Sequence, residues 1–117
     1  GSNVTGTGNT FLGTAAGDVN TASANTFLGA NAGGANTSAA DNTFIGTNAG
    51  LLNVTGVSNT FIGARAGDSN TASGNTFIGK DAGGANTAGT LNTFIGSNSL
   101  LVRIQVWQIP EEISTHF

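Results

Sequence analysis

The chain has 117 residues, of which only 8% are charged, and its formal net charge is −3. The few basic residues are scattered, so the sequence has no basic groove for nucleic acid. The absence of cysteine excludes disulfides and thiolate metal sites. The sequence also lacks an apolar run of the roughly 20 residues that a membrane-spanning helix needs. We therefore expect no nucleic-acid partner and no membrane insertion by this segment.

The N-terminal residues precede the regular part of the chain. We interpret Gly1-Ser2 as the remnant of an expression tag. Residues 3–8 match the second half of a repeat, because the sequence that begins at Asn3 returns almost unchanged at Asn53. The predicted organisation is a tag remnant at 1–2, a repeat array at 3–99 and a non-repeating segment at 100–117.

One phrase, Asn-Thr-Phe followed by Leu or Ile and then Gly, occurs six times along the chain. Its copies begin at nearly equal intervals, at Asn9, Asn25, Asn42, Asn59, Asn75 and Asn92. A second Asn follows most copies at a constant distance, as Asn20 follows Asn9 and Asn36 follows Asn25. Self-similarity at a fixed period, here about 16 to 17 residues, is typical of stacked arrays in which each repeat packs on its neighbours. We call each repeat a coil.

The composition of one coil predicts a β-solenoid. A coil is too short for two helices and a turn, and Gly, Asn and Thr disfavour helix. Thr-Phe-Ile is a β-branched and aromatic triplet that favours a short strand, and the Gly after it favours a bend. The Ala-Gly pairs further along each coil predict tight corners, and the repeated Asn residues predict hydrogen-bonded ladders. The sequence thus indicates an all-β parallel β-solenoid, or β-roll, of about six coils.

Phe and Leu or Ile are neighbours in each predicted strand, so they point to opposite faces. We expect Leu or Ile to fill the narrow coil core together with the Ala column, and Phe to face outward. Six exposed Phe residues would forgo roughly 9 to 18 kcal/mol of burial, so we expect them to be covered by other copies of the chain in a homo-oligomer. The predicted oligomer interface is Phe11, Phe27, Phe44, Phe61, Phe77 and Phe94, and the predicted coil core is Leu12, Leu28, Ile45, Ile62, Ile78 and Ile95.

The period breaks after Leu100. Residues 101–109 contain no Gly or Asn and alternate like one longer strand, which Pro110 ends. An open solenoid end exposes unpaired backbone and bare core, so we expect residues 100–117 to form a cap or an assembly element. The alternative is a frayed chain end.

The Asn-Thr-Phe-Ile-Gly phrase, followed two residues later by Ala-Gly, resembles repeats of bacterial and phage tail-fibre proteins. It also resembles the head repeats of trimeric autotransporter adhesins, which carry a small residue where this chain has Phe. The resemblance covers about residues 3–99. It implies parallel β-rolls arranged as three chains side by side, on the outside of a cell or as part of a virion or tail fibre.

The sequence offers little material for catalysis. His116 is the only histidine and has no partnered nucleophile nearby, so we interpret it as a bystander. The acidic residues of the array do not form the Gly-rich, Asp-containing repeat of calcium rolls, and Gly79-Lys80-Asp81 lacks the Ser or Thr of a phosphate loop. We expect no enzyme activity, no catalytic residue, no cofactor and no metal.

Two classes of function remain. The first is a structural or adhesive module, the shaft or head of a trimeric tail fibre or surface adhesin, whose partners are its own copies and a host-surface glycan or protein. The second is an ice-binding or glycan-binding solenoid. Ice-binding solenoids expose two Thr per strand, whereas here one Thr stands beside Phe in each phrase. The sequence therefore favours the fibre module.

Overall fold

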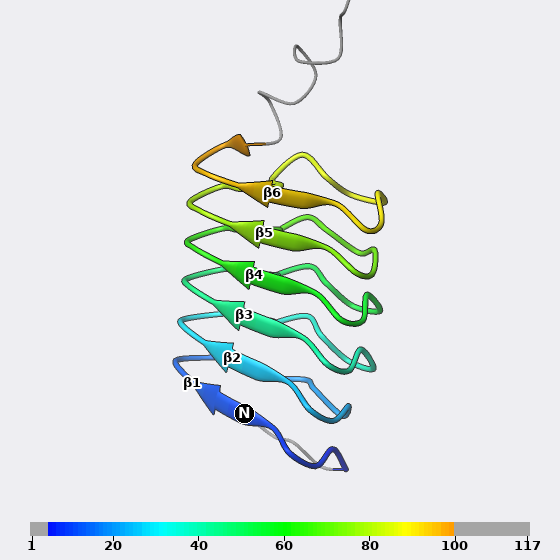
Figure 1. Cartoon of the computed structure of the whole chain (residues 1–117). Coiled ribbons are helices and arrows are strands. Elements are labelled where there is room, and N and C mark those ends of the chain that lie inside the picture. The colour runs from blue at the N-terminus through cyan, green and yellow to red at the C-terminus, as the bar shows by residue number, and fades with distance from the viewer. Residues whose placement is uncertain (1–4, 100–117) are drawn as a thin grey trace, which may run out of the picture.

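The computed structural model describes residues 5–99, in which each coil contributes one short parallel strand (Figure 1). The strands are β1 (Thr10–Leu12), β2 (Thr26–Leu28), β3 (Thr43–Ile45), β4 (Thr60–Ile62), β5 (Thr76–Ile78) and β6 (Thr93–Ile95). This arrangement confirms the predicted all-β parallel solenoid. Residues 1–4 and 100–117 lie outside the described residues, and with them the predicted tag remnant, the predicted cap and His116.

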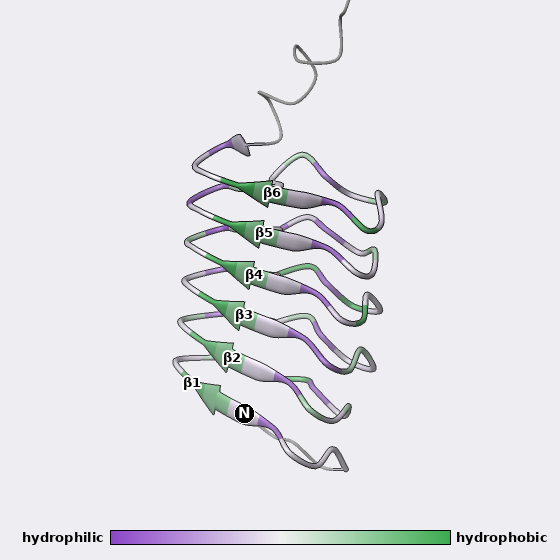
Figure 2. Cartoon of the chain, in the orientation of Figure 1, coloured by the Kyte–Doolittle hydropathy of each residue, from purple (hydrophilic) through white to green (hydrophobic). Residues whose placement is uncertain are grey.

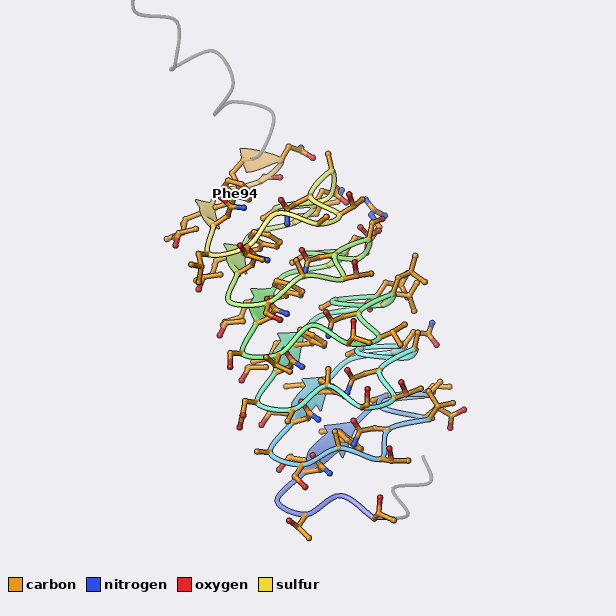
Figure 3. All side chains as sticks on the ribbon, turned by 90° about the vertical axis from the view of Figure 1, so that its right-hand side faces the viewer. Phe94 is labelled. Carbon is orange, nitrogen blue, oxygen red and sulfur yellow. The ribbon has the colours of Figure 1, made fainter. Side chains whose placement is uncertain are left out.

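The strands form one sheet in chain order, and its register is uniform. Thr pairs with Thr, Phe with Phe, and Leu or Ile with Leu or Ile across every strand pair. The Gly after each strand extends the ladder, as where the amide of Gly46 donates to the carbonyl of Leu28 at 2.7 Å. Uniform register places residues of one type in columns along the stack, so side chains lie in layers (Figure 3).

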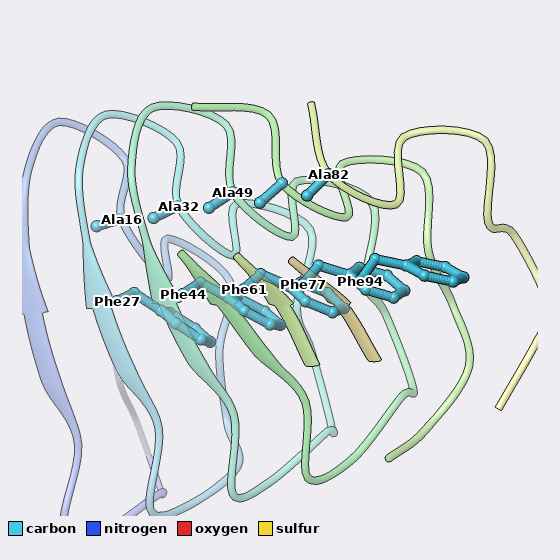
Figure 4. Packing of buried hydrophobic residues seen from close by; sticks show 10 residues of the cluster. Ala16, Phe27, Ala32, Phe44, Ala49, Phe61, Phe77, Ala82 and Phe94 are labelled. Carbon is cyan, nitrogen blue, oxygen red and sulfur yellow. The ribbon is translucent and has the colours of Figure 1, made fainter. Parts of the chain in front are cut away.

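The core is a column of Phe rings facing a column of Ala (Figure 4). Consecutive rings are 4.8 to 5.0 Å apart between centroids and within 5 to 11° of parallel. These distances lie in the favourable range for offset stacking. The facing column consists of Ala16, Ala32, Ala49, Ala66 and Ala82, all buried. The Ala column was predicted to be inside and is confirmed there.

The predicted orientation of the strand residues is wrong. Phe27, Phe44, Phe61 and Phe77 are 0% exposed within a single chain, Phe94 is also buried, and Phe11 packs against the same cluster. Leu12, Leu28, Ile45, Ile62, Ile78 and Ile95 lie on the outer surface, exposed or half-buried. The Phe column therefore forms the coil core, and it cannot be the axis of a trimer. The physical reason is volume, because a wall of Ala and Gly leaves space that a ring fills and a smaller aliphatic side chain does not.

Glycine is required where the Ala-Gly corner of each coil packs against the ring of the Phe column. Gly50 follows the buried Ala49 and has φ +59°. A Cβ at Gly50 would lie 2.5 Å from Cε2 of Phe44, and the corresponding Gly of other coils meets its own Phe equally closely. Positive φ at Gly50 agrees with the predicted role of the Ala-Gly pairs as corners.

Two columns of buried Asn complete the interior. In the first column, the side-chain oxygen of one Asn accepts the backbone N–H of the Asn one coil later, as from Asn59 N to Asn42 Oδ1 at 2.9 Å. In the second column, side-chain amide bonds to side-chain amide at three of the four steps, as from Asn36 Nδ2 to Asn20 Oδ1 at 2.6 Å, and the step from Asn53 to Asn70 lacks this bond. The predicted ladder is confirmed in the second column, whereas in the first column the partner is backbone. These bonds satisfy polar groups that the narrow interior removes from water.

The coils have two lengths, and the difference between them is confined to one corner. The second Asn follows the first at the same distance in both kinds of coil, so the extra residue of the longer coil lies after the second Asn. At this corner, Ala24 ends a shorter coil and Asp41 ends a longer one, and both have φ +60°. The strands before and after both coils keep the same register.

Candidate interaction surface

The outer face of the sheet is built from two residues of each strand. Because Phe points inward, Thr and the Leu or Ile two positions later point outward together. We call the surface formed by these residues in β1 to β6 the strand face. Leu12 is 66% exposed and Ile95 is 68% exposed, whereas Ile45, Ile62 and Ile78 are half-buried between their neighbours. Colouring by hydropathy shows an apolar end on every strand (Figure 2).

The strand face has a constant chemical composition. Thr occupies the first outward position of all six strands, and Leu or Ile occupies the second. None of the six Thr hydroxyls bonds to another part of residues 5–99. The charged residues of the described part of the chain lie outside the strands, at Asp18, Asp41, Arg65, Asp68, Lys80 and Asp81. The strand face is thus uncharged, apolar along one column and hydroxyl-bearing along the other.

The charged residues gather mainly in the fourth and fifth coils. Arg65 and Asp81 form a two-pronged ion pair, with 2.6 Å from Nε to Oδ1 and 2.9 Å from Nη2 to Oδ2. This hydrogen-bonded partner lowers the pKa of Asp81. Burial, followed by the charge of Asp81, raises the pKa of Asp68. The pair crosses from one coil to the next, so it acts as one more contact between layers.

A second apolar feature interrupts the polar sides of the stack in the third coil. Leu52 is 50% exposed, Val54 is 38% exposed and Val57 is 39% exposed. Leu51 is half-buried, and its Cδ1 lies 3.3 Å from the position of a Cβ at Gly34 in the coil before. Other coils carry smaller or polar residues in place of the two Leu, so this patch does not form a column.

The residue pattern led to the correct columns but not to the strand face. A signal for the strand face was nevertheless present in the sequence, because Ala and Gly occupy the opposite wall of every coil and only a large side chain fills the remaining space. With Phe assigned to the interior, Thr and Leu or Ile follow as the outward pair.

The described residues hold no cluster of metal-binding type. No three His, Cys, Asp or Glu side chains come together within residues 5–99. The same part of the chain has no helix with the length and hydropathy needed to cross a bilayer.

The architecture places the chain in the class of parallel β-solenoid repeat proteins. Comparison with protein-family models, with curated proteins and with solved structures finds no match for this chain. The features of this chain that bear on its function are therefore the Phe and Asn columns and the strand face.

Proposed function

We propose that this solenoid is a rigid structural or adhesive module of a fibre, the shaft or head of a trimeric tail fibre or surface adhesin, located outside the cell or on a virion. The observation that supports it is the uniform register of all six strands, which produces an unbroken column of stacked Phe and an unbroken first column of bonded Asn. Every layer bonds to the next, so the stack resists bending and extension.

The proposal includes the homotrimer, but the column expected to hold its chains together is now the Leu and Ile column in place of the Phe column. A Phe column that is buried within one chain needs no cover from other copies. The exposed apolar column is Leu and Ile, and it runs along the whole described stack. A host-surface glycan or protein is the proposed external partner, held through many equivalent shallow contacts whose weak affinities add.

The test of this function uses the protein in its source organism. Antibodies raised against the repeat array should label fibres on the surface of the cell or particle in immunogold electron microscopy. Light scattering of the purified chain should give three times the chain mass of 11.5 kDa. Labelling confined to the cell interior would contradict the fibre assignment.

A second candidate, binding to an ordered surface such as ice, is favoured by one observation. The strand face presents two columns of methyl-bearing side chains in a regular grid, with free Thr hydroxyls beside Leu or Ile. The strand face differs from a face with two Thr per strand because it has an aliphatic residue at the second outward position. Measurement of thermal hysteresis tests this candidate. Strong hysteresis, together with no signal on a glycan array, would favour it over the fibre.

A further inference from the structure

We infer that the strand face is the contact between copies of this chain, with the copies running parallel and the Leu and Ile column of each copy meeting the same column of its neighbour. This inference rests on the proposed fibre function and names the surface through which that fibre assembles.

The exposed residues of the strand face are constant along the stack. The interior positions of a solenoid are constant because the coil needs them for packing. Outer positions have no such requirement, and most of them vary here. The position after the strand Gly holds Thr14, Ala30, Thr47, Ala64 and Lys80 in successive coils. The strand face is the exception, because its first outward residue is always Thr and its second is always Leu or Ile. A contact outside the single chain explains this constancy.

The repeat spacing of the strand face also favours a second copy as its partner. The layers are 4.8 to 5.0 Å apart, as the Phe centroids show. A surface that matches this spacing over all six layers must have the same repeat, and a second copy has it by construction. Identical side chains on paired parallel sheets form tightly interdigitated dry contacts. A glycan or an irregular protein surface meets only a few layers at a time.

The lack of charge on the strand face also favours contact between copies of the chain. The strand face contains no ionisable side chain, so charge does not select its partner. Apolar self-contact needs no charge complementarity, and in a parallel pair each Leu or Ile meets an aliphatic side chain of similar size.

A fibre in which all chains start at one end also requires parallel copies, so that β2 meets β2 and β5 meets β5.

The decisive experiment is disulfide trapping in a chain that has no cysteine of its own. Leu28→Cys and Ile78→Cys are prepared separately, with one variant ¹⁵N-labelled, and are then mixed, denatured, refolded together and oxidised. Three layer steps separate these positions, or about 15 Å, which is too far for one disulfide to bridge. Parallel copies should give 28–28 and 78–78 dimers and no 28–78 hybrids. Predominant hybrids would show antiparallel copies and overturn the inference.

Thr37→Cys is the matched control, because Thr37 is exposed in the same coil as Leu28 but lies outside the strands. We expect its disulfide dimer to form at least tenfold more slowly than that of Leu28→Cys. Equal rates would mean random collision and would overturn the inference.

A second test separates self-contact from strand propensity. Ile45→Thr combined with Ile62→Thr keeps β-branched residues in the strands but replaces the apolar Cγ1–Cδ1 arm of each Ile by a hydroxyl group. We expect the association constant to fall at least tenfold in analytical ultracentrifugation, with an unchanged circular dichroism spectrum. The control combines Leu52→Thr and Val54→Thr, which removes two exposed aliphatic side chains elsewhere, and should associate like the wild type. Similar association of both variants would overturn the inference.

The outcomes also separate this inference from the proposed function. If the chain forms a trimer but Leu28→Cys gives no disulfide dimer, the proposed contact is disproved and the fibre function is not. A wild-type chain that stays monomeric at every concentration would disprove the contact and the homotrimer together.

Discussion

Gly50 lies directly against the ring of Phe44, with a φ of +59° that L side chains rarely adopt. A Cβ at Gly50 would stand 2.5 Å from Cε2 of that ring. The backbone of the corner and the ring therefore occupy adjoining space with no room for a methyl group, and the ring cannot move because it is stacked between Phe27 and Phe61.

Replacement of Gly50 by Ala should destabilise the chain by about 2 to 4 kcal/mol, through left-handed backbone strain plus overpacking. Chemical denaturation followed by circular dichroism measures the change. Gly8→Ala is the control, because Gly8 also has positive φ at +69° but a Cβ there would lie 4.0 Å from the nearest atom. It should cost only the backbone strain, about 1 to 2 kcal/mol. Equal effects of the two substitutions would mean that the ring contact is unimportant.

Neighbouring strand residues should differ sharply in their contribution to stability. Phe44→Ala removes a fully buried ring from the middle of the stack and should cost about 3 to 5 kcal/mol. Ile45→Ala removes a half-buried side chain on the outer face and should cost about 1 kcal/mol in the monomer. Thermal or urea unfolding at low protein concentration gives both values. A larger loss for Ile45 than for Phe44 would restore the orientation that the sequence first suggested.

The Asn ladder should be sensitive to loss of a single amide. The side chain of Asn42 donates to the carbonyl of Gly56 at 2.9 Å and accepts from the amide of Asn59 at 2.9 Å. Asn42→Ala removes both bonds and leaves the buried amide of Asn59 without this acceptor, so we expect a loss of about 2 to 4 kcal/mol. Thr71→Ala removes an exposed bond to Thr87 and should cost less than about 1 kcal/mol. Similar unfolding midpoints for both variants would contradict the role of the ladder.

Asp68 should make stability depend on pH. Its pKa in the folded chain is raised above the ordinary value of 3.8, mainly by burial. The folded state therefore holds this proton more tightly than the unfolded state, and the Asp68 contribution to stability falls as the pH rises from 3.8 through the folded pKa. Asp68→Asn removes that unfavourable contribution. The variant should be more stable than the wild type at pH 7, and the difference should shrink below the folded pKa.

Unfolding curves at several pH values test this expectation. Asp18→Asn is the control, because Asp18 also follows an Ala-Gly corner, three coils earlier, and is exposed. A difference for Asp68→Asn that persists unchanged at acid pH would show that the substitution acts through packing rather than charge.

The sequence was sufficient to predict the fold class, the strands and their stacking. Six copies of Thr-Phe-Leu or Thr-Phe-Ile at a fixed spacing allow few other arrangements, and the uniform pairing of Phe with Phe follows from equal repeats. The positive φ of Gly50 and the burial of Ala49 were also predictable, because small residues recur at the same place in each coil.

The direction of the strand side chains was not predictable from alternation alone. Phe44 and Ile45 are both apolar and adjacent, so polarity does not determine which of them faces inward. The choice depends on how much space the small residues opposite the strand, such as Ala49 and Gly50, leave inside the coil, and alternation along the strand carries no information about that space. The predicted Phe interface failed for this reason, and the strand face was missed with it.

The corner after the second Asn allows coil length to vary without changing the pitch of the stack. A coil that ends at Asp41 and a coil that ends at Ala24 deliver the next strand to the same register, because the extra residue is absorbed where φ is already positive. A solenoid with such a corner can accept insertions on one edge while its interior stays periodic. Recognition loops inserted at this edge, by evolution or by protein engineering, would therefore be spaced one layer apart along the stack.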